Sequence, residues 1–167
     1  MAHLEYCSNC GGKNIFGLME GQSRFHCISC KKIHYENPKP TATLICMHQN
    51  QLLLVKRAVD PGKGMWGLPG GFIERGETPE MGAQRELLEE TNLQGGVSNF
   101  LGTCSHFNTI FGDILLMGME VQIKDWSLLK AGDDAEEAIL FPFDELPKLA
   151  FTCHEKIVNM YRKKLLS

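Results

Sequence analysis

The segment GFIERGETPEMGAQRELLEETNL, residues 71–93, carries the pattern from which the fold of this chain can be predicted. On a helical period of 3.6 residues, Glu86, Glu89 and Glu90 share one face, where their carboxylates repel by roughly a few tenths of a kcal/mol per pair. A solvated helix surface is the ordinary explanation, since Arg85 can pair with Glu89 four residues on. The alternative is a face that supplies hard oxygen ligands to divalent cations, whose charge would remove the repulsion.

The same segment predicts where its helix begins and ends. Thr78 suits the N-cap, and Pro79 suits the first helical position. Asn92 suits the left-handed residue that ends a helix, because it is the commonest substitute for glycine there. Gly82 inside the helix costs about 1 kcal/mol relative to alanine, which indicates close packing at that position.

Length and composition limit the class of protein. With 167 residues and 43% hydrophobic composition, the chain is expected to form one main domain and a small module. A net charge of -3 gives no reason to expect a nucleic-acid or membrane partner. The amino terminus lacks a signal-peptide core and no apolar run reaches membrane-spanning length, so we expect a cytoplasmic protein.

The seven cysteines favour metal binding over disulfides, because an odd count without an export signal points to thiolate ligands and free thiols. Two C-x-x-C pairs lie sixteen residues apart, which is the spacing of a four-thiolate zinc site. A closed site of this kind has no open position for substrate, so the zinc would be structural. The predicted ligands are Cys7, Cys10, Cys27 and Cys30, with His26 and His34 as alternatives.

The rest of the chain predicts an alternation of strands and turns that ends in a helix. We expect a hairpin of residues 41–47 and 51–57 around the turn His48-Gln49-Asn50. Thr152 and Glu155 have the spacing of a capping box that would begin the last helix. Further strands are expected at residues 97–107, 113–123 and 137–141.

Residues 71–93 also carry a longer pattern, which resembles the signature G-x5-E-x7-R-E-U-x-E-E-x-G-U of the Nudix hydrolases, where U is aliphatic. Asn92 replaces glycine and is the one departure. WGLPGG at residues 66–71 and FPFDELPKLAF at 141–151 also look like Nudix features. The matching positions are Gly71, Glu77, Arg85, Glu86, Leu87, Glu89, Glu90 and Leu93.

This resemblance implies an α/β protein with the Nudix fold, a mixed β-sheet sandwiched between α-helices. The small zinc-ribbon module ahead of it is similar to that of the NADH and the ADP-ribose or FAD pyrophosphatase relatives. The domains would be residues 1–36, the zinc ribbon, and 37–167, the Nudix hydrolase domain. Many relatives dimerise, so the resemblance allows a homodimer.

The resemblance also implies roles for individual residues. Glu86, Glu89 and Glu90 would hold one to three magnesium or manganese ions together with the carbonyl of Gly70, and Arg85 and Glu77 would brace the loop and helix. The catalytic residues would be Glu89, Glu86 and Arg85, and Phe72 would present its ring to a base. Relatives also draw a base or a ligand from a later loop, which here offers Asp134, Glu136 and Glu137, the last of these as a substrate-binding residue.

The substrate is narrowed by a motif that the chain lacks. NADH pyrophosphatases carry S-Q-P-W-P-F-P-x-S after the box, whereas this chain has TCSHFNTIFGD at residues 103–113. The resemblance therefore favours ADP-ribose or FAD, cleaved at the diphosphate to AMP and a phosphate ester. His106, Phe107 and Phe111 are candidates for a base or ribose pocket. The rival hypotheses are a pyrophosphohydrolase for nucleoside triphosphates such as 8-oxo-dGTP, a nucleic-acid-binding or ligand-sensing regulator, and a structural zinc adaptor.

Overall fold

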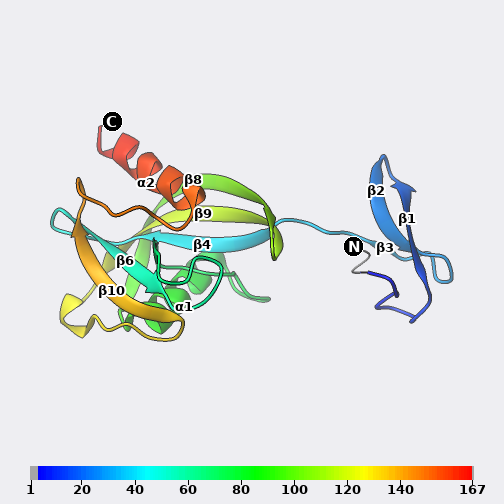
Figure 1. Cartoon of the computed structure of the whole chain (residues 1–167), viewed down its shortest axis with the longest axis horizontal. Coiled ribbons are helices and arrows are strands. Elements are labelled where there is room, and N and C mark those ends of the chain that lie inside the picture. The colour runs from blue at the N-terminus through cyan, green and yellow to red at the C-terminus, as the bar shows by residue number, and fades with distance from the viewer. Residues whose placement is uncertain (1–3, 167) are drawn as a thin grey trace. The chain divides into compact units, whose positions relative to one another are not determined.

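The chain folds as two compact units, of which the first ends at Asn37 and the second begins at Pro38. The computed structural model describes residues 4–166. In the first unit, β1 (Asn14–Met19), β2 (Gln22–Cys27) and β3 (Ile33–His34) form a three-stranded antiparallel sheet (Figure 1). Phe25 is buried against the ring of Phe16, but Phe16 itself is 62% exposed. Such a small core gives the unit little hydrophobic stability of its own.

The second unit contains the remaining strands and both α-helices. Helix α1 comprises Pro79–Thr91, and α2 comprises Thr152–Leu165. A 3-10 helix lies at Trp126–Leu128. The strands are β4 (Lys39–Ile45), β5 (Met47–His48), β6 (Gln51–Arg57), β7 (Trp66–Gly67), β8 (Gly95–Thr109), β9 (Gly112–Ile123) and β10 (Ala135–Pro142).

The strand pairing is mixed. Strand β4 pairs in parallel with β9, which pairs antiparallel with β8. Strand β6 pairs antiparallel with β10, β5 and β7. The predicted hairpin of residues 41–47 with 51–57 is therefore wrong for most of its length, since only Met47 and His48 return along β6. The other strand residues of the segment 41–47 belong to β4, which pairs with the distant strand β9.

The two helices cover opposite faces of these strands (Figure 1). Because side chains alternate along a strand, neighbours in β4 enter different cores. Leu44 packs in one cluster with Leu87 of α1, whereas Ile45 packs in another with Ile157 of α2. All four of these side chains are fully buried. The sequence prediction of a mixed sheet between helices is confirmed.

The observed ends of α1 agree with the cap residues predicted from the sequence. The Thr78 hydroxyl accepts a hydrogen bond from the N–H of Met81 at 3.2 Å, and Asn92 ends the helix at φ 56°. A Cβ on Gly82 would lie 3.3 Å from both a Glu77 oxygen and Ile73, so the predicted close packing is confirmed.

The capping box predicted for α2 is wrong. The N-cap residue is Phe151, which makes no side-chain capping bond. Thr152 is already the first helical residue, so its hydroxyl does not occupy the N-cap position of the predicted box.

Candidate active site

A cavity of about 420 Å³ opens beside the acidic face of α1. Its walls come from β4, the loop before α1, α1 itself, the facing ends of β8 and β9, and the start of α2. The structure thus brings together most of the residues that the sequence singled out. Those that line the cavity are Gly70, Gly71, Phe72, Arg85, Glu86, Glu89, Glu90, His106, Phe111 and Asp134.

Glu90 is held at the inner end of this cavity. It is 5% exposed, and its Oε2 accepts a hydrogen bond from the N–H of Gly70 at 2.8 Å. Only glycine fits at position 70, because φ is +132° and a Cβ would lie 2.1 Å from the carbonyl oxygen of Ala42. Burial raises the pKa of Glu90 to about 8. A buried carboxylate of this kind is stabilised in its charged form by a nearby cation.

Arg85 organises the other carboxylates. Its Nε and Nη2 donate to the two carboxylate oxygens of Glu77 at 2.7 and 3.0 Å. Its Nη1 donates to Glu86 at 2.7 Å and to Glu89 at 3.0 Å. Nη2 also donates to the carbonyl oxygen of Phe72 at 2.8 Å, which ties the helix to the preceding loop.

The three glutamates offer carboxylate oxygens that can serve as ligands for divalent metal ions. Each uses one carboxylate oxygen in these bonds, and the other has no hydrogen-bond donor among residues 4–166. Hard cations such as magnesium prefer oxygen ligands of this type. Burial also raises the pKa of Glu86, so a cation here would favour its ionised form. The residues present therefore fit magnesium or manganese, whose binding stays a prediction.

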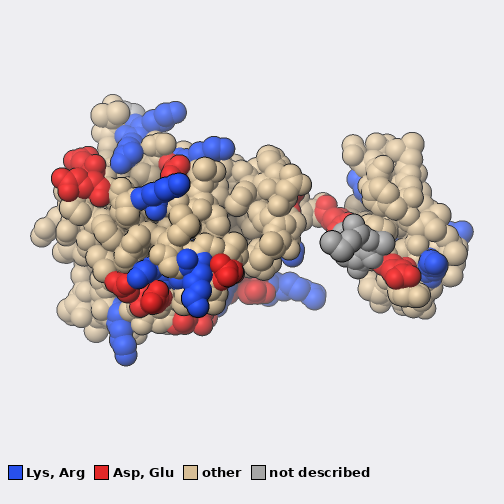
Figure 2. Space-filling model, in the orientation of Figure 1, with Lys and Arg blue, Asp and Glu red and all other residues tan. Residues whose placement is uncertain are grey.

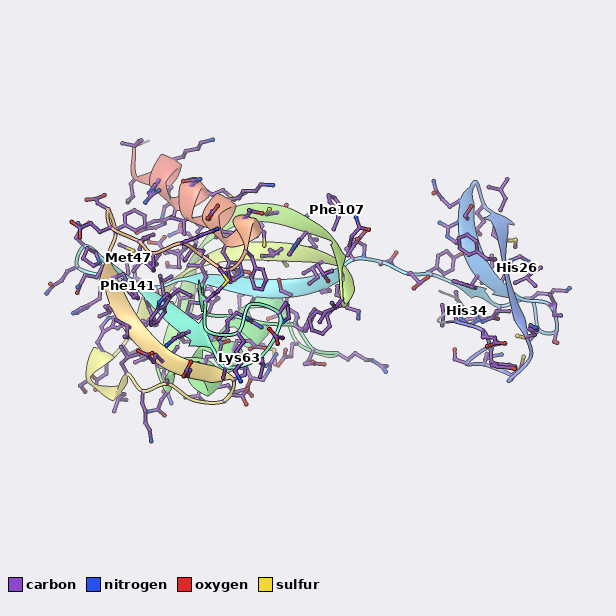
Figure 3. The ribbon with its side chains drawn as sticks, viewed as in Figure 1. His26, His34, Met47, Lys63, Phe107 and Phe141 are labelled. Carbon is purple, nitrogen blue, oxygen red and sulfur yellow. The ribbon has the colours of Figure 1, made fainter. Side chains whose placement is uncertain are left out.

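An aromatic pair also lines the cavity. Phe72 and Phe111 meet edge to face, with ring centres 5.5 Å apart. Phe72 is positioned by a bridge to Thr41 of β4, and Phe111 stands at the turn between β8 and β9. Phe107 does not line the cavity, because it projects outward from β8 and is 62% exposed (Figure 3).

The acidic residues of the later loop, Asp134, Glu136 and Glu137, lie in two different places. Asp134 lines the cavity. Glu136 and Glu137 lie in β10 and pair with Lys56 at 3.7 and 2.7 Å, away from the cavity lining. The structure therefore does not bring Glu137 to the place that the sequence prediction gave it.

Two further residues, Arg57 and Phe151, line the cavity without a site role predicted from the sequence. Arg57 ends the predicted strand 51–57, and Phe151 ends the Nudix-like segment 141–151. Cys153 and His154 are consecutive residues of α2, and consecutive residues on a helix do not face each other. The Cys153 thiol is 3.6 Å from Nδ1 of His106, whereas His154 accepts a hydrogen bond from the Leu68 N–H at 3.0 Å. Each therefore has a different partner, and both side chains reach the cavity wall.

The four cysteines of the first unit gather as the spacing predicted. Their sulfur atoms all lie within 4.8 Å of one another. Cys7 and Cys30 are 3.7 Å apart and Cys10 and Cys27 are 3.5 Å apart, close to the roughly 3.8 Å between two sulfurs bound to one tetrahedral zinc. The alternative ligands His26 and His34 lie in β2 and β3 outside this cluster (Figure 3). The cluster can hold a zinc ion.

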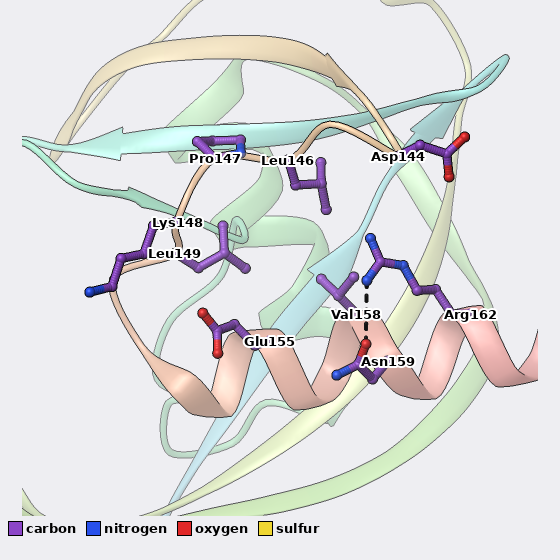
Figure 4. A pocket seen from close by; sticks show the side chains of 9 residues that line it. All are labelled: Asp144, Leu146, Pro147, Lys148, Leu149, Glu155, Val158, Asn159 and Arg162. Carbon is purple, nitrogen blue, oxygen red and sulfur yellow. Dashed lines mark hydrogen bonds between the residues drawn. The ribbon is translucent and has the colours of Figure 1, made fainter.

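A second cavity, of about 410 Å³, lies between α2 and the segment 144–149 (Figure 4). It mixes the acids Asp144 and Glu155 with the bases Lys148 and Arg162. Arg162 already donates to the carbonyl oxygen of Phe143 and to Asn159. None of the site residues predicted from the sequence lines this cavity.

Charge on the visible surface is also mixed. Acidic and basic side chains alternate on the face of the second unit seen in Figure 2, without a broad basic stripe on that face. Among the residues that the structure describes, neither α1 nor α2 has the length and apolar character to cross a membrane.

The comparisons with known proteins agree with this fold and site. Residues 38–161 match the NUDIX domain. An ADP-ribose pyrophosphatase of Methanocaldococcus jannaschii is 38% identical over 159 residues, which cover 90% of this chain and 89% of that protein. The crystal structure of a NUDIX hydrolase from Nitrosomonas europaea superposes with a TM-score of 0.83 at 32% identity, covering 97% of this chain and 93% of that one. The chain therefore belongs to the Nudix hydrolases, and the enzyme class predicted from residues 71–93 is confirmed.

The chain is also similar, over a shorter length, to a protein with a different activity. The NAD-capped RNA hydrolase NudC of Vibrio cholerae is 34% identical over 90 residues, which cover 54% of this chain and 32% of NudC. This match spans a much smaller part of either protein than the match to the ADP-ribose pyrophosphatase.

Proposed function

We propose that the chain hydrolyses the diphosphate bond of ADP-ribose or FAD, giving AMP and a second phosphate ester. One observation carries this proposal: the same cavity holds three glutamate carboxylates suited to divalent metals and an aromatic pair suited to a base. The similarity to the pyrophosphatase of M. jannaschii, which extends over 90% of this chain, supports ADP-ribose as the substrate.

In this proposal Glu86, Glu89 and Glu90 bind magnesium or manganese, and the carbonyl oxygen of Gly70 completes a metal site. The bound ions would polarise the phosphoryl oxygens and neutralise charge that develops in the transition state. The hydrogen bond from Gly70 to Glu90 supports this arrangement, because it fixes the loop against the innermost carboxylate.

Glu89 is proposed as the general base. Its side chain is 43% exposed against 15% for Glu86, so water reaches it most easily. Glu89 would take a proton from a water molecule while the water oxygen bonds to phosphorus. The phosphorus–oxygen bond to the other phosphate then breaks, and that phosphate departs with the electron pair. Arg85 would keep Glu86 and Glu89 oriented, and Glu86 is the second candidate for the base.

Phe72 and Phe111 are proposed to contact the nucleobase, since an aromatic ring can stack on or meet the edge of a base. The prediction that Glu137 binds substrate gains no support, because its carboxylate is paired with Lys56 outside the cavity lining.

The four-cysteine cluster is proposed to hold a structural zinc ion, which would make residues 1–36 a zinc ribbon ahead of a Nudix domain at 37–167. Support comes from the tight cluster of sulfur atoms and from the small core of this unit. Zinc would then supply much of the free energy that keeps the unit folded.

The proposed function is tested by measuring release of phosphate esters from ADP-ribose, FAD, NADH and 8-oxo-dGTP with magnesium or manganese. We expect ADP-ribose or FAD to be cleaved most efficiently, and Glu89→Gln to lower kcat by about 10²- to 10⁴-fold. Glu80→Gln is the matched control, since Glu80 is an exposed residue of α1 outside the cavity lining. Preferential cleavage of NADH or 8-oxo-dGTP, or full activity of Glu89→Gln, would contradict the proposal.

A further inference from the structure

The cavity is strongly acidic for a site that is proposed to take a diphosphate. Seven carboxylate side chains line it, among them those of Glu86, Glu89 and Glu90. The only lysine or arginine residues of the described lining are Arg57 and Arg85. Metal ions can offset part of this charge, but the phosphate oxygens that do not contact metal still need hydrogen-bond donors.

Arg85 is not available for this purpose. Its Nε, Nη1 and Nη2 all donate hydrogen bonds to Glu77, Glu86, Glu89 or the carbonyl of Phe72. Turning toward a substrate would break these bonds and release the carboxylates that Arg85 orients. Its role is therefore to position acidic residues.

Arg57 differs in that the end of its side chain is free. Its Nε donates to the carbonyl oxygen of Pro61 at 2.7 Å. No described residue accepts a hydrogen bond from its Nη1 or Nη2. These two nitrogen atoms form the planar fork with which arginine binds a pair of phosphate oxygens.

The guanidinium group is also held in place before substrate arrives. It lies over the ring of Phe151, with its central carbon 5.3 Å from the ring centre. Gly62 lies next to both groups, since a Cβ built there would be 3.6 Å from Cδ of Arg57 and from Cζ of Phe151. A fixed side chain loses less conformational entropy when it binds a ligand.

The alternation of β6 explains why Arg57 reaches the cavity. The preceding residue, Lys56, points to the other face and pairs with Glu137 at 2.7 Å. Arg57 stands opposite Ala135, the neighbour of the cavity residue Asp134. The two neighbouring cations of β6 therefore differ: Lys56 is paired outside the cavity, whereas Arg57 has free hydrogen-bond donors inside it.

We infer that Arg57 binds non-bridging oxygens of the substrate diphosphate through Nη1 and Nη2, in the same cavity as the metal-binding glutamates. This inference rests on the proposed function for its substrate class. It assigns phosphate recognition to a residue outside the segment 71–93. A purely structural role, in which Arg57 only fastens the loop at Pro61, is the competing explanation.

Binding of methylenediphosphonate in the presence of magnesium tests the inference without requiring turnover, because its P–C–P bond is not hydrolysed. Calorimetry should show that Arg57→Gln weakens this binding by about 10- to 100-fold. Lys56→Gln is the matched control, since it removes a positive charge from the residue directly before Arg57 and should leave binding unchanged. Arg57→Lys, which keeps the charge but loses the fork, should fall between wild type and Arg57→Gln.

A second readout separates phosphate recognition from a structural effect. Inhibition by AMP should weaken in Arg57→Gln, whereas inhibition by adenosine, which lacks phosphate, should not change. Equal losses for AMP and adenosine, an equal loss in Lys56→Gln, or no binding of methylenediphosphonate by wild type would overturn the inference. If wild type binds methylenediphosphonate through Arg57 but cleaves neither ADP-ribose nor FAD, the proposed function fails and the phosphate site remains.

Discussion

Arg85 binds Glu77 in a bidentate manner through one edge of its guanidinium group, with Nε donating to Oε1 at 2.7 Å and Nη2 to Oε2 at 3.0 Å. Glu77 lies just before α1 and also accepts the N–H of Glu74 at 2.8 Å. The pair therefore closes the loop onto the helix and leaves Nη1 for Glu86 and Glu89. A single arginine thus connects the stability of the loop to the orientation of the proposed catalytic carboxylates.

Glu77→Gln should lower both stability and activity. The amide nitrogen of glutamine would face an arginine N–H donor, so one of the two paired bonds would be lost. Arg85 lowers the pKa of Glu77 from 4.5 to about 2. Because the folded-state pKa is depressed, the stabilising effect is present above about pH 4.5 and is lost as the pH falls toward 2. Thermal unfolding at several pH values measures this.

The difference in Tm between wild type and Glu77→Gln should therefore shrink as the pH falls from 4.5 toward 2. Arg75→Gln is the control, since Arg75 is an exposed neighbour outside the network. A difference in Tm that stays constant over this range would show that the charge of Glu77 does not stabilise the fold.

Gly70 and Gly71 should respond differently to substitution by alanine. A Cβ on Gly70 would lie 2.1 Å from a backbone oxygen, at a φ of +132°, so Gly70→Ala should destabilise the fold by about 1–3 kcal/mol or more. A Cβ on Gly71 would lie 2.6 Å from the Glu86 carboxylate, which can move aside. Gly71→Ala should therefore lose activity with a smaller loss of stability.

Urea unfolding and kcat, measured on both variants, distinguish the two effects. Gly96→Ala serves as the control, because its Cβ would have no heavy atom within 4 Å and its φ is not positive. Full activity of Gly71→Ala would mean that the position of Glu86 next to this loop is not needed for catalysis.

Cys27→Ser should abolish zinc binding and unfold the amino-terminal unit. A closed tetrahedral site loses most of its affinity when one thiolate is missing. Metal analysis should find about one zinc per chain in wild type and little in the variant. Cys104→Ala is a suitable control, since Cys104 is a buried cysteine outside the sulfur cluster. Retention of zinc and of native structure by Cys27→Ser would refute the zinc assignment.

His154 should make the stability of the chain sensitive to mild acid. Removal from water lowers the pKa of His154 to about 3, and its Nδ1 accepts the N–H of Leu68. In the unfolded chain the ring protonates below its ordinary pKa of 6.5, while the folded chain keeps it neutral. The stability due to neutral His154 is therefore complete above pH 6.5 and decreases as the pH falls toward 3.

His154→Asn tests this expectation, because its Oδ1 can accept the Leu68 N–H and does not titrate. Between about pH 7 and pH 5, urea unfolding should show a smaller loss of stability in the variant than in wild type. The same pH dependence in both proteins would show that His154 does not contribute to it.

The sequence by itself determined the features that depend on residues close in the chain. The cap residues of α1, the shared face of its three glutamates and the two C-x-x-C turns follow from helix geometry and from the short reach of a few residues. The longer Nudix pattern then identified the fold class and the enzyme class, because its spacing combines a loop and a helix that are adjacent in sequence.

Only the tertiary structure decided which distant residues meet. Strand β4 pairs with β9 instead of forming the expected hairpin with β6, and Glu137 pairs with Lys56 instead of lining the cavity. Arg57 and Phe151 come together across more than ninety residues of chain to form one wall of that cavity. Such contacts depend on the packing of the whole sheet between its helices, for which the local pattern of a sequence contains no unique solution.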